Sequence, residues 1–127
     1  MKKLTTSLLF MLAILSINAQ NLNEISFIFE NKNIFTEQFK SKTEEKVFHF
    51  KIDGINNETQ AEILKNKILS YRGVKSFKIT KQNGNYFGDI TLYKYAYTWQ
   101  YYQTFMKLNK INYFVINGNK YTWRNLQ

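Results

Sequence analysis

The side chains of this sequence that are best suited to chemistry gather around one short loop, "GINNETQ", at residues 54–60. The single histidine, His49, and the carboxylate of Asp53 come just before this loop. Both are common metal ligands, but two donors fall short of the four that a structural zinc site uses. Cysteine is absent from the sequence, which excludes thiolate metal sites and cysteine nucleophiles.

The sequence contains no arrangement that predicts catalysis. Asp53 and Asp89 fall on strands that a sheet could bring together, but carboxylate catalysis requires a pair whose pKa values are pushed apart by their surroundings. No serine, histidine and aspartate show the pattern of a catalytic triad. We therefore expect a protein that is not an enzyme and that needs no cofactor.

Two elements must position the loop. Residues 46–53, "KVFHFKID", alternate between apolar and polar side chains, which predicts a half-buried strand with His49 on the face away from the core. Residues 58–72 carry apolar side chains at helical spacing. Asn57 is a good N-cap for this helix, and Gln60 stands where its side chain can reach back to the helix start.

The rest of the chain continues this pattern. It predicts, in order, strand 74–81, strand 86–95, helix 99–110, strand 111–116 and a short strand 120–123. "QNGN", at residues 82–85, predicts a hairpin turn because Asn-Gly accepts the positive φ of a type I′ turn. In the second helix we expect Tyr101, Phe105 and Leu108 to share the buried face, with Tyr102 beside them.

The order β-α-β-β-α-β predicts an α+β protein with a ferredoxin-like fold. We expect a four-stranded antiparallel sheet with both helices on one face, plus a C-terminal hairpin. The folded domain is expected to span residues 46–127. Residues 20–45 are expected to form an N-terminal extension or linker, in which "ISFIF" is a strand packed on the edge of the domain.

Residues 1–19 have the pattern of a signal peptide. Two lysines precede an apolar run at residues 8–17, and small and polar residues follow it. The run is shorter than the about 20 residues that span a bilayer. We therefore expect a periplasmic or secreted protein with no stable membrane span after cleavage. The formal net charge is +9, but the lysines are scattered, as in "KNK" and "LNK", which is typical of a solvating surface.

Residues 46–117 resemble the heavy-metal-associated (HMA) domain, the fold of copper chaperones and of metal-ATPase N-terminal modules. That family ends its first strand in Gly-Met-x-Cys-x-x-Cys and opens its second strand with Gly-Val. Here Gly54 and Ile55 match the first two positions, and the pair at 73–74 matches the Gly-Val. Asn57 and Gln60 occupy the two cysteine positions. The resemblance implies a metal loop, but neutral amides cannot replace thiolates for a soft metal ion.

We therefore expect a binding or protein-interaction module of the cell envelope with a protein partner. The alternative is heavy-metal handling through ligands other than cysteine. RNA binding on the open sheet face is disfavoured, because Asp89 stands where an aromatic residue would stack on a base. The candidate interaction surface comprises His49, Lys51, Asp53, Asn56 and Tyr93.

Overall fold

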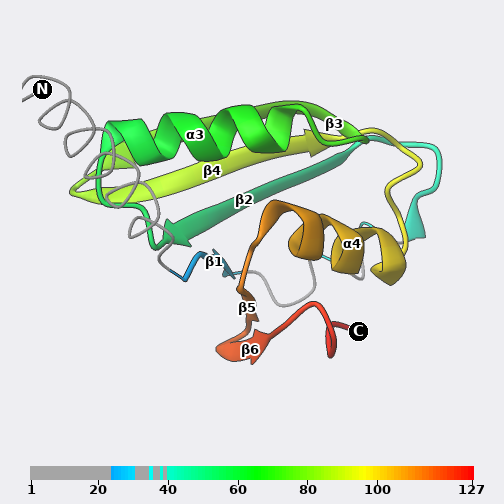
Figure 1. The fold of residues 1–127 in the computed structure, drawn as a ribbon. Helices are drawn as coiled ribbons and strands as arrows, with labels where there is room; N and C mark the ends of the chain where they lie inside the picture. Colours follow the sequence, from blue (N-terminus) through cyan, green and yellow to red (C-terminus); the bar gives the residue numbers. More distant parts are fainter. Residues whose placement is uncertain (1–23, 31–34, 36–37, 39) are drawn as a thin grey trace, which may run out of the picture.

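The computed structural model describes residues 24–30, 35, 38 and 40–127, so the predicted signal peptide lies outside the described residues. Within the described residues the chain forms two α-helices and a mixed sheet of six strands (Figure 1). The α+β class predicted from the sequence is confirmed. The elements are β1 (Ser26–Phe29), β2 (Lys46–Asp53), α3 (Glu58–Leu69), β3 (Val74–Gln82), β4 (Asn85–Leu92), α4 (Trp99–Asn109), β5 (Tyr113–Ile116) and β6 (Asn119–Tyr121).

The sheet has the order β3-β4-β2-β1-β5-β6. Strand β1 lies between β2 and β5, antiparallel to the first and parallel to the second. The predicted four-stranded antiparallel sheet with a separate C-terminal hairpin is therefore wrong. Strand β1 was expected at the edge but lies inside the sheet, and β5 and β6 pair antiparallel as the last two strands of the same sheet.

Two phenylalanines of β1 account for its central position. Phe27 stacks on Phe50 of β2 with ring centroids 4.2 Å apart and lies 5.8 Å from Phe114 of β5. Phe29 lies 5.2 Å from Phe50 and 5.1 Å from Phe114. Burying each of these rings stabilises the fold by roughly 1.5–3 kcal/mol. An edge position would leave one flank of each ring without its partner strand.

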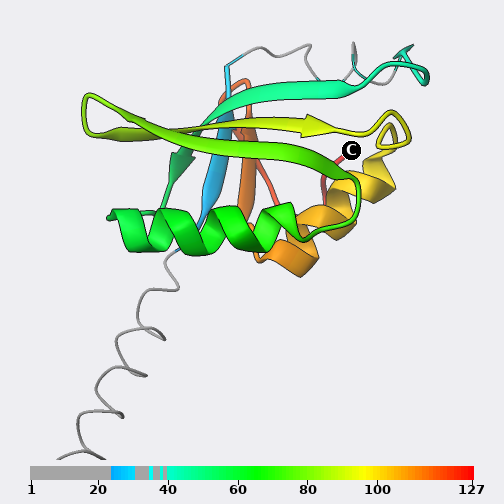
Figure 2. The same cartoon turned by 90° about the horizontal axis from the view of Figure 1, so that it is seen from above.

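Both helices cover the same face of the sheet (Figure 2). Helix α3 buries Ala61, Leu64 and Ile68 in the core. Helix α4 buries Phe105 and Met106 together with Tyr102 and Asn109, all from one helical face.

The predicted buried face of α4 is partly wrong. Leu108 is 59% exposed, and Tyr101 is half-buried at the margin of the core. Tyr102 takes the central place because its ring packs edge-on against Phe48 and its hydroxyl donates a hydrogen bond to the Ala96 carbonyl, 2.9 Å away. The helix is thus rotated so that Tyr102, rather than Tyr101, faces the sheet.

The predicted Asn-Gly turn is confirmed, and a threonine caps the second helix. Asn83 and Gly84 both have positive φ, 52° and 80°, between the antiparallel strands β3 and β4. Thr98 caps α4, where its hydroxyl accepts from the Tyr101 N–H. No helix among the described residues is long and apolar enough to cross a membrane.

Candidate functional site

The loop that resembles a metal-binding loop serves to start α3. The Asn57 side chain accepts a hydrogen bond from the Gln60 N–H, 2.9 Å away, and the Gln60 side chain accepts from the Asn56 N–H, 2.7 Å away. This exchange closes the helix N-terminus as the sequence predicts. Ile55 is buried. The amide oxygens at the two cysteine positions are therefore already engaged with the backbone.

Gly54 explains why a glycine precedes this loop. Its φ is +104°, and a Cβ atom would lie 2.3 Å from the carbonyl oxygen of Glu24. The chain entering β1 thus passes directly over Gly54. The glycine is therefore required for the insertion of β1 beside β2.

The five residues of the predicted interaction surface do not form one site. Lys51 and Asp53 form a loose ion pair, with Nζ and Oδ1 3.8 Å apart, at the end of β2 that leads to Asn56. Tyr93 follows Leu92, which pairs with Lys46 at the opposite end of β2. An eight-residue strand therefore separates Tyr93 from Asp53.

His49 lies between these ends on the open face of the sheet. Its Nδ1 atom is 2.6 Å from Oδ1 of Asp89 on β4, and its ring stacks on Phe87 with centroids 5.7 Å apart. His49 and Asp89 side chains are 63% and 51% exposed. Among the described residues, no group of three or more histidine, cysteine, aspartate or glutamate side chains could hold a metal ion. The pair supplies two donors at most.

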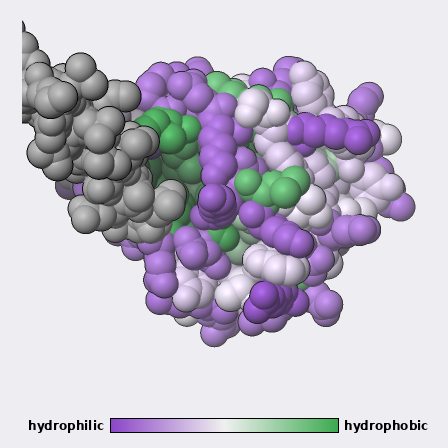
Figure 3. All heavy atoms as spheres, in the orientation of Figure 1, coloured by the Kyte–Doolittle hydropathy of each residue, from purple (hydrophilic) through white to green (hydrophobic). Residues whose placement is uncertain are grey.

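A different feature is a hollow on the side of the molecule that α3 and α4 form. It lies between α3, the C-terminal end of α4 with the loop that follows, and the segment after β6, and its volume is about 850 Å³. We call it the basic groove. Its apolar lining consists of Ile25, Ile55, Ile63, Leu64, Met106 and Ile111, and its cations are Lys67, Lys107, Lys110 and Arg124, with Trp123 between the last and Lys107. The space-filling view shows apolar atoms exposed among hydrophilic side chains on the side of the molecule seen in Figure 1 (Figure 3).

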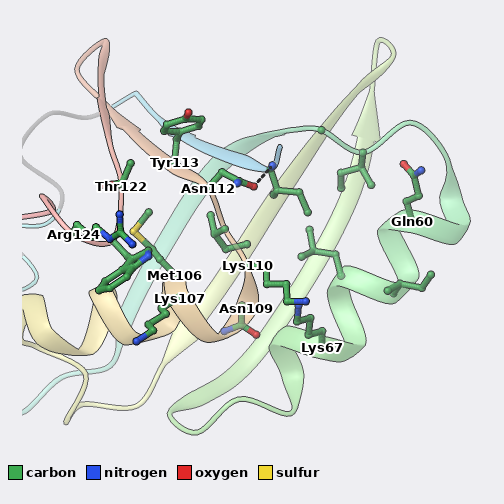
Figure 4. A pocket seen from close by; sticks show the side chains of 17 residues that line it. Gln60, Lys67, Met106, Lys107, Asn109, Lys110, Asn112, Tyr113, Thr122 and Arg124 are labelled. Carbon is green, nitrogen blue, oxygen red and sulfur yellow. Dashed lines mark hydrogen bonds between the residues drawn. The ribbon is translucent and has the colours of Figure 1, made fainter. Parts of the chain in front are cut away.

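Two lysines meet at one end of the basic groove. Figure 4 shows Lys67 of α3 beside Lys110, which follows α4. Burial lowers the pKa of the Lys67 ammonium below its ordinary value of 10.5, and the nearby charge of Lys110 lowers it further. Lys110 holds a left-handed conformation, with φ of 55°, as the C-cap of α4. The repulsion between these two positive charges is unfavourable for the folded state.

Two more cations lie at the other end, around Trp123. The Lys107 Nζ atom is 4.7 Å from the centre of the Trp123 ring, and the Arg124 guanidinium carbon is 5.1 Å away. Cations at such distances are attracted by the electron-rich face of the indole ring. Aromatic contact thus holds these two side chains beside the groove without neutralising their charge.

No family model, curated protein or solved structure matches the chain. The resemblance to the HMA domain stays a prediction.

The sequence contained only a faint signal for the basic groove. Lys67 belongs to "KNK" and Lys110 to "LNK", two of the scattered lysine stretches that were read as solvating. Ile63 stands beside the apolar stripe of α3 and is 58% exposed. This faint signal consists of two sequence features. One is an apolar residue next to the buried stripe of α3, and the other is a lysine in the last turn of each helix.

The lining of the groove has the composition of a ligand pocket. Aspartate and glutamate do not occur among its lining residues, and its hydroxyls belong to Tyr113 and Thr122. Ligand pockets typically combine an apolar wall with a few polar groups in a volume of about 300–1,000 Å³, and the basic groove fits this description.

Proposed function

We propose that this chain is an exported, non-enzymatic binding module of the cell envelope and that the basic groove is its binding surface. The observation that carries the proposal is a hollow of about 850 Å³ whose apolar lining combines the exposed Ile63 with buried aliphatic side chains of the core. The expected signal peptide at residues 1–19 supports export. Either a small molecule or an apolar segment of an envelope protein would fit this description.

A neutral fluorescent probe, N-phenyl-1-naphthylamine, tests whether the groove binds apolar groups. The full chain is expressed and the exported product is titrated, with amide chemical shifts mapping the site. We expect shifts at Ile55, Leu64 and Ile111. Replacing Ile63→Gln removes apolar wall worth about 1 kcal/mol and should weaken binding about fivefold.

The matched control is Leu108→Gln. Leu108 is 59% exposed, like Ile63 at 58%, but does not line the groove. This variant should bind the probe as the unmodified chain does. Equal losses in both variants, or chemical shifts confined to other surfaces, would contradict the proposal.

Metal binding on the open sheet face is the second candidate function. It rests on one observation, the contact between His49 and Asp89, which places two possible ligands together on an exposed strand pair. A partner would supply the remaining ligands. Titration with Zn(II) and Ni(II) should then shift the His49 ring signals at micromolar metal. Unchanged signals at millimolar metal would rule this candidate out.

A further inference from the structure

The four cations of the basic groove are brought to one hollow and take part in none of the ion pairs found among the described residues. Ion pairs within the described residues join His49 to Asp89, Lys51 to Asp53, Lys65 to Glu62 and Lys75 to Glu45. Neither the groove lysines nor Arg124 take part in any of them, and no acidic residue lines the groove. Among the described residues, the groove therefore carries positive charge with no carboxylate in its lining.

Helix dipoles explain only part of this arrangement. Lys67 and Lys107 stand in the last turns of α3 and α4, where a cation is favourable. Lys110 already lies beyond α4, and its charge is unfavourable for Lys67. A bound anion between the two ammonium groups would offset both the burial of Lys67 and this repulsion.

Apolar surface adjoins the two lysines directly. Ile63 and Leu64 precede Lys67 on α3 by about one turn, and Ile111 follows Lys110 in the chain. A ligand whose charge lies between the ammonium groups would therefore place the rest of its structure against aliphatic side chains. This demands a molecule with a negative group at one end and an apolar chain behind it.

We propose that the basic groove binds a single-chain anionic amphiphile, such as a long-chain carboxylate. Its head group lies at Lys67 and Lys110 (Figure 4), and its chain lies along Ile63, Leu64 and Ile111. This inference rests on the proposed function of the groove. A groove of about 850 Å³ suits a small ligand. A stable protein partner would typically cover about 800 Å² on each side, a flatter and wider contact.

Calorimetric titration of the exported product with matched ligands tests the inference. The ligands are decanoate, 1-decanol and decyltrimethylammonium, which share one chain length and differ in charge, and acetate, which lacks the chain. Decanoate should bind at least about tenfold more tightly than decanol, because hydrogen bonds to charged groups are the strong ones. The cationic ligand and acetate should bind more weakly than decanol.

Replacing both lysines, as Lys67→Gln with Lys110→Asn, should lower decanoate affinity about tenfold and leave decanol affinity unchanged. Asparagine is chosen at 110 because it tolerates the left-handed backbone there. The control Lys65→Gln with Lys94→Gln removes the same net charge outside the groove and should leave the decanoate affinity unchanged.

The outcomes separate the two proposals. If decanol binds in the groove as tightly as decanoate, the anionic ligand class is wrong while the groove remains the binding surface. If none of the chain ligands and no neutral probe binds, both proposals fall. If only vesicles of anionic phospholipid bind, and decanoate does not, the positive charge serves a membrane surface and the inference is overturned.

Discussion

The open face of the sheet and the basic groove differ in the neighbours of their basic side chains. On the sheet face, His49 lies beside Asp89 and Lys51 lies beside Asp53, so these two bases each have an acid as a neighbour. In the groove, Lys67 meets Lys110, another base. Two bases of the sheet face are thus paired with acids of the same chain, whereas the two lysines at the end of the groove lie beside each other.

Two lysines show the difference most directly. Lys75, near the end of the sheet, donates a hydrogen bond to Glu45 with Nζ and Oε1 2.5 Å apart, and this bond raises the pKa of Lys75. Burial and a neighbouring cation lower the pKa of Lys67. A pair formed within the chain needs no external ion, whereas a half-buried cation beside another cation favours one. Proximity of charges alone therefore does not indicate a binding site, whereas two cations held together beside an apolar hollow favour an anionic ligand.

Removing one core ring that lies beneath both regions should have the largest effect on stability. Phe27→Ala deletes the ring that links β2, β1 and β5, and we expect it to lower the free energy of unfolding by about 3–5 kcal/mol. Ile25, just before β1, lines the groove, so ligand binding should be lost as well. Denaturant unfolding and probe titration measure the two effects.

The matched control for this variant is Phe87→Ala, which removes a ring from the open face. Phe87 is only half-buried and stacks on His49, so the expected loss is about 1 kcal/mol or less. Similar losses for the two phenylalanines would mean that β1 does not hold the sheet together.

Converting the groove to the charge pattern of the sheet face should have the next largest effect. Lys67→Glu places a carboxylate beside Lys110 and gives that lysine a partner within the chain. We expect decanoate affinity to fall by more than about tenfold, since attraction is replaced by repulsion. The free energy of unfolding should change by about 1 kcal/mol or less.

The reciprocal variant on the sheet face is Asp89→Asn, which leaves His49 without its acid. It should not create decanoate binding, because no apolar groove adjoins that site. If decanoate binds at His49 in this variant, an unpaired base is sufficient for decanoate binding and the apolar hollow is not required for it.

The sequence predicts those features that depend on neighbouring residues. Asn57 and Gln60 are three residues apart, and their hydrogen bonds follow from that spacing. The Asn83-Gly84 turn follows from backbone preference alone. The position of β1 does not, because it depends on contacts between Phe27 and Phe114, which lie far apart in the chain.

The basic groove escapes sequence-based prediction for the same reason. Lys67 and Lys110 stand in separate helical segments, and each one resembles an ordinary solvating lysine. Only the packing of α3 beside the end of α4 brings their charges together. The rotation of α4 by about one residue relative to the predicted face also decides which side chains reach the groove.

The opposite pKa shifts of Lys67 and Lys75 predict a smaller, pH-dependent difference. As pH rises, Lys67 should lose its proton below 10.5, before Lys75 does. The protonated form of Lys67 is disfavoured in the folded chain, so its contribution to the free energy of unfolding improves as pH rises towards 10.5. The contribution of Lys75 and Glu45 is fully present below 10.5 and is lost only above it.

Carbon-13 signals of the two lysine Cε atoms, followed by NMR as a function of pH, measure this order. Decanoate affinity should decline as Lys67 titrates, and the decline should be absent in Lys67→Gln. Lys67 titrating together with Lys75 would contradict the burial of Lys67 beside Lys110.

The ion pair on the sheet face should give the smallest effect. Replacing Asp89→Asn removes the partner of His49, but both side chains are more than half exposed. Exposed pairs contribute about 0–1 kcal/mol because water and salt screen them, so we expect a loss of about 0.5 kcal/mol in unfolding experiments at neutral pH. Added salt should remove this loss of stability, because both side chains are exposed. Decanoate binding in the groove should be less sensitive to salt, because Lys67 is partly buried. A stability loss for Asp89→Asn that persists in high salt and exceeds the loss for Lys67→Glu would contradict this order. The ion pair of the sheet face would then contribute more to stability than the charges of the groove.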